Sequence, residues 1–501
     1  MKAVFKKAIA LGATACMLFS IAGCGTKTAQ TDGTSMTKLV YVMSGPGKQQ
    51  DSEKVYKAFN EKLQEYIPGL EIEFKIIPLA DFTQQFMLMQ TSRETIDIAN
   101  TYGLSMSTEV KNGTFLKLDD LLNEYGKDMR QALPEWLWEY GKVNGDIYQI
   151  PSYQMLSVGY GLRFFRDQAE KYLDIDELKK ELSENKTFTD KYYDILEDYM
   201  AKLKENGELG KGFAAGDYIL KGYEKLLDYY VIKHGEETPK VEQFFATEDA
   251  KRNFDRMADW YKKGYIREDV MSANDYDRMV GKREGYTIST CIIGYQQEEV
   301  DAQQYNDEFL DIPFEDYYYI PAANAAAGTG IMANTKYPEL CMQFLNLMQS
   351  EQGKELLNMI IYGIEGDHFT KIGDDRIQTE YTGQATSNDR YGIYKWILGN
   401  TSLAYDTQSD MEGYKDWAFN TVNKSEARSV VMGFVPDTEK ISSKLAQVNT
   451  VKGEYRGGLA TGCIPNHEER YAEFLDKMQK AGNDEIISEL QKQVDKFLGQ
   501  K

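Results

Sequence analysis

Apolar residues follow two different periods where folding of the chain is expected to begin. Residues 39–43 are continuously apolar and predict a strand, and residues 70–77, which alternate apolar with charged side chains, predict a second one. Between them, Val55, Phe59 and Leu63 keep one face of a helix apolar. This strand, helix, strand order predicts a βαβ unit, and therefore parallel pairing of the two strands.

The same alternation continues for one more unit, whereas the end of the chain follows a helical period only. A helix over 84–93 leads into a strand over 96–99, so the predicted fold class is α/β. Apolar residues at helical spacing over 471–478 and 486–497 predict two closing helices, which the Ala-Gly pair at 481–482 separates.

The first residues of the chain form a separate pattern, in which a basic segment precedes an apolar one. Lys2, Lys6 and Lys7 precede an apolar stretch over 8–22, which is too short to span a membrane and is wrongly flanked for a spanning helix. This order predicts a signal peptide over 1–23, and the mature protein is therefore expected outside the cytoplasm.

The end of that stretch resembles the lipobox of bacterial lipoproteins. Residues 21–24 read Ile-Ala-Gly-Cys, and in lipoproteins such a cysteine is lipidated and becomes the new N-terminus. Cys24 is therefore the predicted lipid anchor, and residues 24–37 are expected to be a flexible tether with a reach of roughly 20 Å. The alternative is an ordinary signal peptide whose cysteine is incidental.

Length and charge limit the classes of partner. The 501 residues include 58 basic and 79 acidic side chains, a formal net charge of −21, so a nucleic-acid partner is not expected. No apolar run after Cys24 reaches the length of a membrane span. The mature chain exceeds what one core usually holds, and we expect at least two domains.

Motifs for metal or cofactor chemistry are missing from the sequence. The three histidines and the three late cysteines are widely spaced, and there is no HExxH, CxxC or GxSxG motif. Residues 45–49 fail as a phosphate-binding loop, because the required first glycine would be Val42 and the required Ser or Thr would be Gln49. We therefore expect no metal, no cofactor and no enzymatic activity. Cys291, in a strand, and Cys341, on a helix, are expected to be small buried apolar residues.

Several stretches together are similar to the extracellular solute-binding proteins of bacterial ABC importers, the maltose-binding-protein-like family. Residues 143–151 (VNGDIYQIP) match a signature of that family, and residues 160–167 resemble the strand after its first crossover. Residues 362–369 (YGIEGDHF) resemble the YGxEGxHY stretch of a lipoprotein subgroup, with Phe369 in place of the usual Tyr. The closing segment over 433–493 also looks like that of the subgroup.

The resemblance implies a two-lobed periplasmic-binding-protein fold with several interdomain crossovers and a ligand in the cleft. The boundaries that we infer place lobe one at 38–155 and 320–390, and lobe two at 156–319 and 391–501. Such a protein captures its ligand by hinge closure and delivers it to ABC permease subunits and their ATPase, which are separate chains. We expect the protein to be a monomer that is anchored to the extracellular face of the cell membrane of a Gram-positive bacterium. Anchoring at a periplasmic face is the alternative.

An oligosaccharide is the expected ligand, because sugar rings need flat aromatic platforms and a few placed polar groups, and this chain has 35 Tyr and 22 Phe. The ends of parallel strands, the crossings and the subgroup stretch are the places where ligand contacts are expected. The candidates are Tyr102, Tyr153, Gln154, Arg163, Tyr295, Gln296, Tyr362, Glu365, His368 and Trp396.

Each candidate has a structural alternative. For any single aromatic residue, packing alone is more common than ligand contact. Glu365 and His368 could equally well tie down a glycine-rich turn. At least one of Trp136 and Trp138 is expected in the core.

Two other functions stay open from the sequence. One is a binding protein for a peptide or an organic acid, since aromatic clefts serve these ligands too. The other is a surface glycoside hydrolase that uses a pair of the 79 acidic residues.

Overall fold

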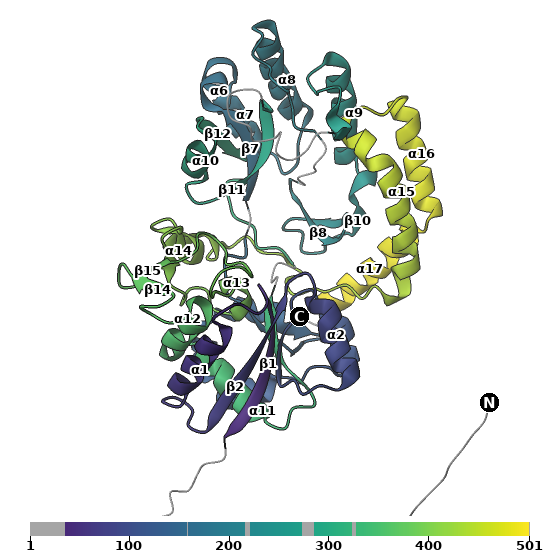
Figure 1. The fold of residues 1–501 in the computed structure, drawn as a ribbon. Helices are drawn as coiled ribbons and strands as arrows, with labels where there is room; N and C mark the ends of the chain where they lie inside the picture. Colours follow the sequence, from purple (N-terminus) through teal and green to yellow (C-terminus); the bar gives the residue numbers. More distant parts are fainter. Residues whose placement is uncertain (1–35, 158, 216–220, 273–284, 323–326, 500–501) are drawn as a thin grey trace, which may run out of the picture. The chain divides into compact units, whose positions relative to one another are not determined.

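The computed structural model describes residues 36–157, 159–215, 221–272, 285–322 and 327–499 (Figure 1). The predicted signal peptide, the lipobox with Cys24 and nearly all of the predicted tether lie outside the described residues. Among the residues described, no helix combines the length and the apolar run that crossing a bilayer requires.

The first sheet contains five strands in the order β2-β1-β3-β13-β6. β1 (Thr37–Gly45) pairs in parallel with β2 (Leu70–Pro78) and β3 (Ile98–Asn100), which confirms the parallel pairing predicted from the sequence. β13 (Gly328–Ile331) is antiparallel to both β3 and β6 (Ile150–Pro151), so the sheet is mixed. A strand that is distant in the sequence therefore completes the sheet.

Both faces of β1 are buried, which explains its continuous apolar run. Leu39, Tyr41 and Met43 pack into one core with the helices α1 (Ser52–Leu63), α11 (Pro338–Met348) and α12 (Lys354–Tyr362). Val40 and Val42 point the other way and pack against α2 (Phe82–Ser92). Successive side chains alternate between the two faces of a strand, so one continuous run supplies two cores.

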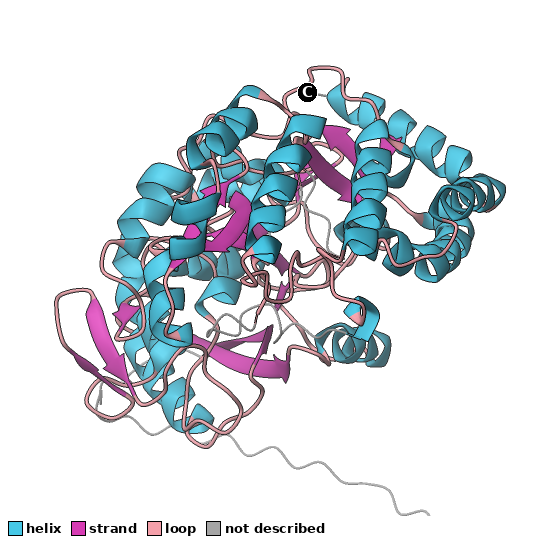
Figure 2. Cartoon of the chain, turned by 90° about the horizontal axis from the view of Figure 1, so that it is seen from above, coloured by secondary structure: helices cyan, strands magenta, loops and turns pink. Residues whose placement is uncertain are grey.

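The second sheet is antiparallel and has the order β11-β7-β12. β7 (Gly159–Phe165) lies between β11 (Ile288–Ile293) and β12 (Phe309–Pro313), and its buried Leu162 and Phe164 face a core made largely by helices. Those helices are α6 (Arg166–Tyr172), α7 (Ile175–Glu184), α8 (Asp190–Glu205) and α9 (Glu248–Lys263), whereas α10 (Gln297–Tyr305) contacts β12 outside this core. Figure 2 shows helices arranged around the strands.

Three helices close the chain, of which the sequence predicted two. α16 (His467–Lys480) and α17 (Asn483–Leu498) confirm the predicted pair, and Gly482 separates them with a positive φ of 101°. α15 (Ser442–Thr461) was not predicted. Apolar residues of all three helices share a core with the small sheet of β8 (Tyr223–Leu227), β9 (Tyr230–Lys233) and β10 (Glu242–Gln243).

Shorter elements connect these parts. The helical ones are α3 (Met106–Lys111), α4 (Asp119–Tyr125), α5 (Lys127–Ala132), η1 (Glu135–Gly141), η2 (Phe244–Ala246), η3 (Val270–Ser272), η5 (Glu351–Gly353), α13 (Lys395–Leu398), α14 (Tyr414–Asp416), η6 (Trp417–Val422) and η7 (Glu439–Ile441). The strands are β4 (Lys142–Val143), β5 (Asp146–Ile147), β14 (Phe369–Lys371), β15 (Arg376–Thr379) and β16 (Asp406–Thr407).

The packing of residues 391–403 affects where the boundary between the two lobes lies. Tyr391, Ile393, Leu398 and Leu403 are buried in the core of the first sheet, whereas the sequence-based boundary assigned 391–501 to lobe two. An apolar pattern predicts that a residue is buried, but it does not predict in which of the cores the residue packs. The four lobe boundaries stay predictions, and this packing favours a crossing later than residue 404.

Candidate functional site

A buried asparagine organises the carboxyl ends of β1 and β3. The Asn100 side chain donates to the carbonyl oxygens of Gly328 (2.9 Å) and Ile397 (3.2 Å), and its oxygen accepts from the Ser44 hydroxyl and the Tyr102 amide. Asn100 is fully buried, so these bonds are protected from water. They fix the start of the loop that carries Tyr102 next to α13.

Tyr102 and Trp396 meet at this edge of the sheet. Their ring centroids lie 5.4 Å apart in an edge-on arrangement, and Trp396 also stacks on Tyr394 at 6.0 Å. Tyr102 and Trp396 are both half-buried. The structure thus brings together two candidates that are distant in the sequence.

Tyr153 joins a second group of rings. Its centroid lies 4.8 Å from that of Phe419 and 6.4 Å from that of Trp136. The Tyr153 carbonyl oxygen accepts from the amide and the hydroxyl of Thr401, and the carbonyl of its neighbour Gln154 accepts from Asn423. Burial raises the pKa of the Tyr153 phenol further above its ordinary value of 10.0.

Tyr295 belongs to a third group, around Trp417. Trp417 lies 5.4 Å from Tyr295, 5.9 Å from Tyr414 and 5.6 Å from Tyr318 between ring centroids. Gly413 has a φ of 84°, and a Cβ at that position would come within 2.4 Å of the Tyr295 hydroxyl oxygen. A glycine is therefore needed for Tyr295 to reach this place. Gln296, by contrast, is exposed at the start of α10.

The short π-helix η6 connects the second and third groups, and sequence reasoning missed it. It carries both Trp417 and Phe419, and single π-helical turns occur often at functional sites. A π-helix has no sequence period of its own that could reveal it. The available signal was the spacing of the two aromatic residues beside a conformationally special Gly413.

Arg163 and Tyr362 lie in cores rather than among these rings. The Arg163 side chain is only 4% exposed, donates to both oxygens of Asp311 at 2.8 and 2.6 Å, and also pairs with Asp301. Tyr362 is 3% exposed and donates its hydroxyl to the Tyr405 carbonyl at 2.7 Å. Both side chains are thus satisfied by the protein itself. Trp138 is likewise buried, as expected for at least one of the two tryptophans, whereas Trp136 is half-buried.

Glu365 and His368 hold a turn together. Gly363 takes a φ of 93°, and the Ile364 amide donates to Nδ1 of His368 at 3.1 Å, so that Nε2 of the histidine carries the proton and faces Asp51 at 3.2 Å. Glu365 is exposed and pairs with Lys371 at 3.0 Å. These contacts favour the structural alternative for this stretch.

The carboxylates of Asp51 and Asp367 with His368 would be close enough together to hold a metal ion. However, one Nη atom of Arg390 lies 2.7 Å from Asp51 and 2.9 Å from Asp367. The guanidinium already supplies the positive charge that these carboxylates need, and with Lys54 it lowers the pKa of Asp367. The donor set therefore fits an ion-pair network better than a metal.

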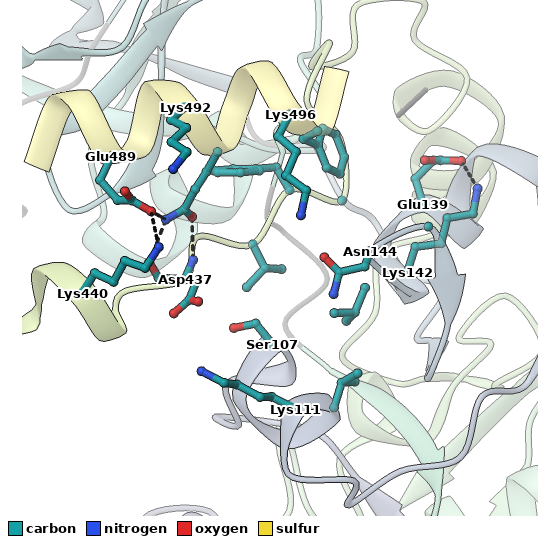
Figure 3. Close-up of a pocket in the computed structure, with 18 residues that line it drawn as sticks. Ser107, Lys111, Glu139, Lys142, Asn144, Asp437, Lys440, Glu489, Lys492 and Lys496 are labelled. Atoms are coloured by element: carbon teal, nitrogen blue, oxygen red, sulfur yellow. Dashed lines mark hydrogen bonds and ion pairs between the residues drawn. The ribbon is translucent and has the colours of Figure 1, made fainter. Parts of the chain in front are cut away.

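A cavity of about 910 Å³ lies elsewhere, between α17 with η7 and α3 with the β4–β5 hairpin (Figure 3). None of the ligand-binding candidates from the sequence lines it. Its walls are rich in lysine and contain two phenylalanines but no tyrosine or tryptophan.

Comparisons with known proteins agree with this architecture. A family model described as a domain of unknown function, DUF3502, matches residues 430–499, which include α15, α16 and α17. A search of curated protein sequences gives no significant match.

Solved structures match nearly the whole chain. The N-glycan transport solute-binding protein NgtS of Streptococcus pneumoniae has a TM-score of 0.71 at 21% identity, over 92% of this chain and 99% of that one. An HMO-binding, ABC-transporter-associated solute-binding protein of Bifidobacterium longum infantis has a TM-score of 0.62 at 14% identity, over 94% and 100%. The S. pneumoniae substrate-binding protein FusA, in complex with kestose, has a TM-score of 0.55 at 12% identity, over 93% and 100%. The chain therefore has the two-lobed α/β fold of the ABC-transporter solute-binding proteins.

Proposed function

We propose that this protein is the solute-binding component of an ABC importer and that it captures an oligosaccharide. The observation that carries the proposal is the set of half-buried rings built by Tyr102, Tyr153, Tyr295, Trp396 and Trp417. Flat, partly exposed rings offer platforms for the apolar faces of sugars, and neighbouring hydroxyls supply hydrogen bonds. The fold supports the same proposal, because its structural neighbours include an N-glycan transport protein, an HMO-binding protein and a protein in complex with kestose.

Ligand capture would use closure about the segments that run between the cores. Ile320 and Arg428 pair there in a parallel bridge. The buried Glu224 of β8 joins these segments, because its carboxylate accepts from the Ala322 amide (3.0 Å) and from the Ser429 hydroxyl (2.5 Å). Such a junction can act as a hinge, and a saccharide that contacts both sides favours the closed state.

The anchoring and the partners follow from the sequence. Cys24 is lipidated, becomes the N-terminus when residues 1–23 are removed, and holds the protein at the extracellular face of the membrane. The permease and its ATPase are separate chains that accept the saccharide from the closed protein. Mass spectrometry of the membrane-extracted protein tests the anchor, since a Cys24→Ser variant should lose both the acyl mass and the membrane association.

Isothermal titration with a saccharide panel tests the function. The panel contains Man1GlcNAc, Man5GlcNAc, kestose and alginate oligosaccharides, with amino acids and short peptides as the competing classes. Saturable binding of one glycan class, with the glycan recovered intact, is expected. Binding of a peptide or organic acid instead would keep transport but discard the saccharide, and cleavage of the glycan would favour the hydrolase.

A further inference from the structure

The lysine-rich cavity is built from segments far apart in the sequence. α17 and η7 form one wall, and α3 with the hairpin of β4 and β5 forms the other (Figure 3). Its volume of about 910 Å³ is within the range of small-ligand sites.

The charge of the lining is opposite to that of the protein. Five lysines and three carboxylates line the cavity, whereas the whole chain has a formal net charge of −21. Three of the lysines have acidic neighbours: Lys142 lies 2.6 Å from Glu139, Lys440 lies 3.9 Å from Glu489, and Lys111 pairs with Glu439. These pairs neutralise part of the lining only.

The other two lysines have no such neighbour. No carboxylate in the described part of the chain lies within ion-pair distance of Lys492 or Lys496. They are one helical turn apart on α17, where like charges repel each other. Figure 3 shows both side chains extending from α17 toward the cavity, on the side that faces Asn144 and Lys111.

The rest of the lining adds a hydrogen-bond donor and apolar side chains. Asn144 and Gly145 both have positive φ, 53° and 91°, which is the conformation of a two-residue type I′ hairpin turn, and this turn places Asn144 at the lysine-rich wall. Phe434 and Phe497 pack together at 5.6 Å between centroids and line the cavity beside the lysines. Apolar surface next to ammonium groups limits hydration and strengthens their attraction to an anion.

We propose that this cavity binds a small ligand with two or more anionic oxygen groups, such as a diphosphate or a tricarboxylate. Lys492 and Lys496 bind one end of the ligand, and Asn144 with Lys111 faces the other. The ligand would thus join α17 to α3, at a place separate from the aromatic rings assigned to the saccharide. Neither the saccharide nor the permease is needed for this binding.

Calorimetric titration of the purified protein with pyrophosphate and with citrate tests the proposal at constant, low ionic strength. The test variant is Lys492→Gln with Lys496→Gln. The control is Lys179→Gln with Lys180→Gln, which removes the same charge from two exposed lysines of α7 that lie away from the cavity. One saturable site is expected, at least about tenfold weaker in the test variant and unchanged in the control.

Three results would overturn the proposal. One is the absence of saturable binding of both anions. Another is an equal loss in the test and control variants, which would mean that only net charge matters. The third is binding to anionic phospholipid vesicles without binding of the soluble anions, which would assign these lysines to a membrane surface. Because no saccharide is present in the titration, none of these results bears on the proposed transport function.

Discussion

The rings around Trp417 and the ion pairs around Arg163 differ in what their surroundings leave unsatisfied. Trp417, Tyr295 and Tyr153 are half-buried, so each keeps some surface that a ligand can contact. The Arg163 guanidinium is buried, and two aspartates occupy its donors. A ligand can gain contacts only where the protein has not already made them. The first region is therefore suited to binding and the second to stability.

The largest effect is expected from removing the buried cation. Arg163→Met should lower the free energy of unfolding by about 3–5 kcal/mol, because Asp301 and Asp311 would be left as uncompensated buried charges. Urea denaturation measures this change. The triple variant that also carries Asp301→Asn and Asp311→Asn should recover part of it. An unchanged stability together with lost saccharide binding would return Arg163 to the site.

Truncation of the half-buried rings should reduce ligand affinity and leave stability nearly unchanged. Trp417→Ala and Tyr153→Ala should each weaken saccharide binding by about tenfold or more, with little change in melting temperature, because both side chains are only half-buried and each variant removes a proposed platform. Calorimetry measures the affinity. Tyr337→Ala is the matched control, since Tyr337 is 40% exposed and lies outside the ring groups. Unaltered affinity in both test variants would show that the site is elsewhere.

A smaller effect is expected at a buried candidate. Tyr362→Phe removes the hydroxyl that donates to the Tyr405 carbonyl and should cost about 1 kcal/mol of stability. Saccharide affinity should stay the same, because the ring is enclosed in the core. A loss of affinity without a loss of stability would contradict the division between the two regions.

The smallest effect concerns the junction and depends on pH. Burial raises the pKa of Glu224 above its ordinary value of 4.5. Between the two pKa values the folded protein holds a proton on Glu224 that the unfolded chain has already released. The stability that the protonated Glu224 contributes is therefore complete below the pKa of the unfolded chain, and it is lost as the pH rises through the pKa of the folded protein. Relative to Glu224→Gln, which does not titrate, the wild type should lose stability as pH rises above 4.5.

Urea denaturation of both proteins over this pH range measures the difference. Glu365→Gln serves as the control, since Glu365 is exposed and no core surrounds it. Parallel curves for wild type and Glu224→Gln would mean that Glu224 stays charged throughout the range.

The sequence predicts those helices and strands correctly whose own residues show a clear apolar pattern. The strands near 39–43 and 70–77, their parallel pairing, and the helices α1, α2, α16 and α17 are all found in the structure. It missed α15, whose three glycines weaken the helical signal, and the π-helix η6, which has no distinctive period.

The candidate site could be predicted only in part, for a related reason. Strand ends can be located from the pattern alone, and the aromatic residues predicted there, Tyr102, Tyr153 and Tyr295, all lie in groups of half-buried rings. Their contact with a ligand stays a prediction. The pattern could not find Trp417 or Phe419, since their value depends on rings contributed by other segments. Nor could it exclude Arg163, because the two aspartates that occupy its donors are distant in the sequence.

The sequence by itself determined those strands and helices whose apolar pattern is clear, such as β1, where one continuous apolar run supplies two cores. Only the tertiary structure decided which groups remain available to a ligand. Availability depends on partners brought from far along the chain: Asp301 and Asp311 occupy the donors of Arg163, whereas Tyr153 stays half-buried beside Phe419 and Trp136. The local apolar pattern determines which side chains are buried. Packing between distant segments determines which of their polar groups already have a hydrogen-bonding or charged partner.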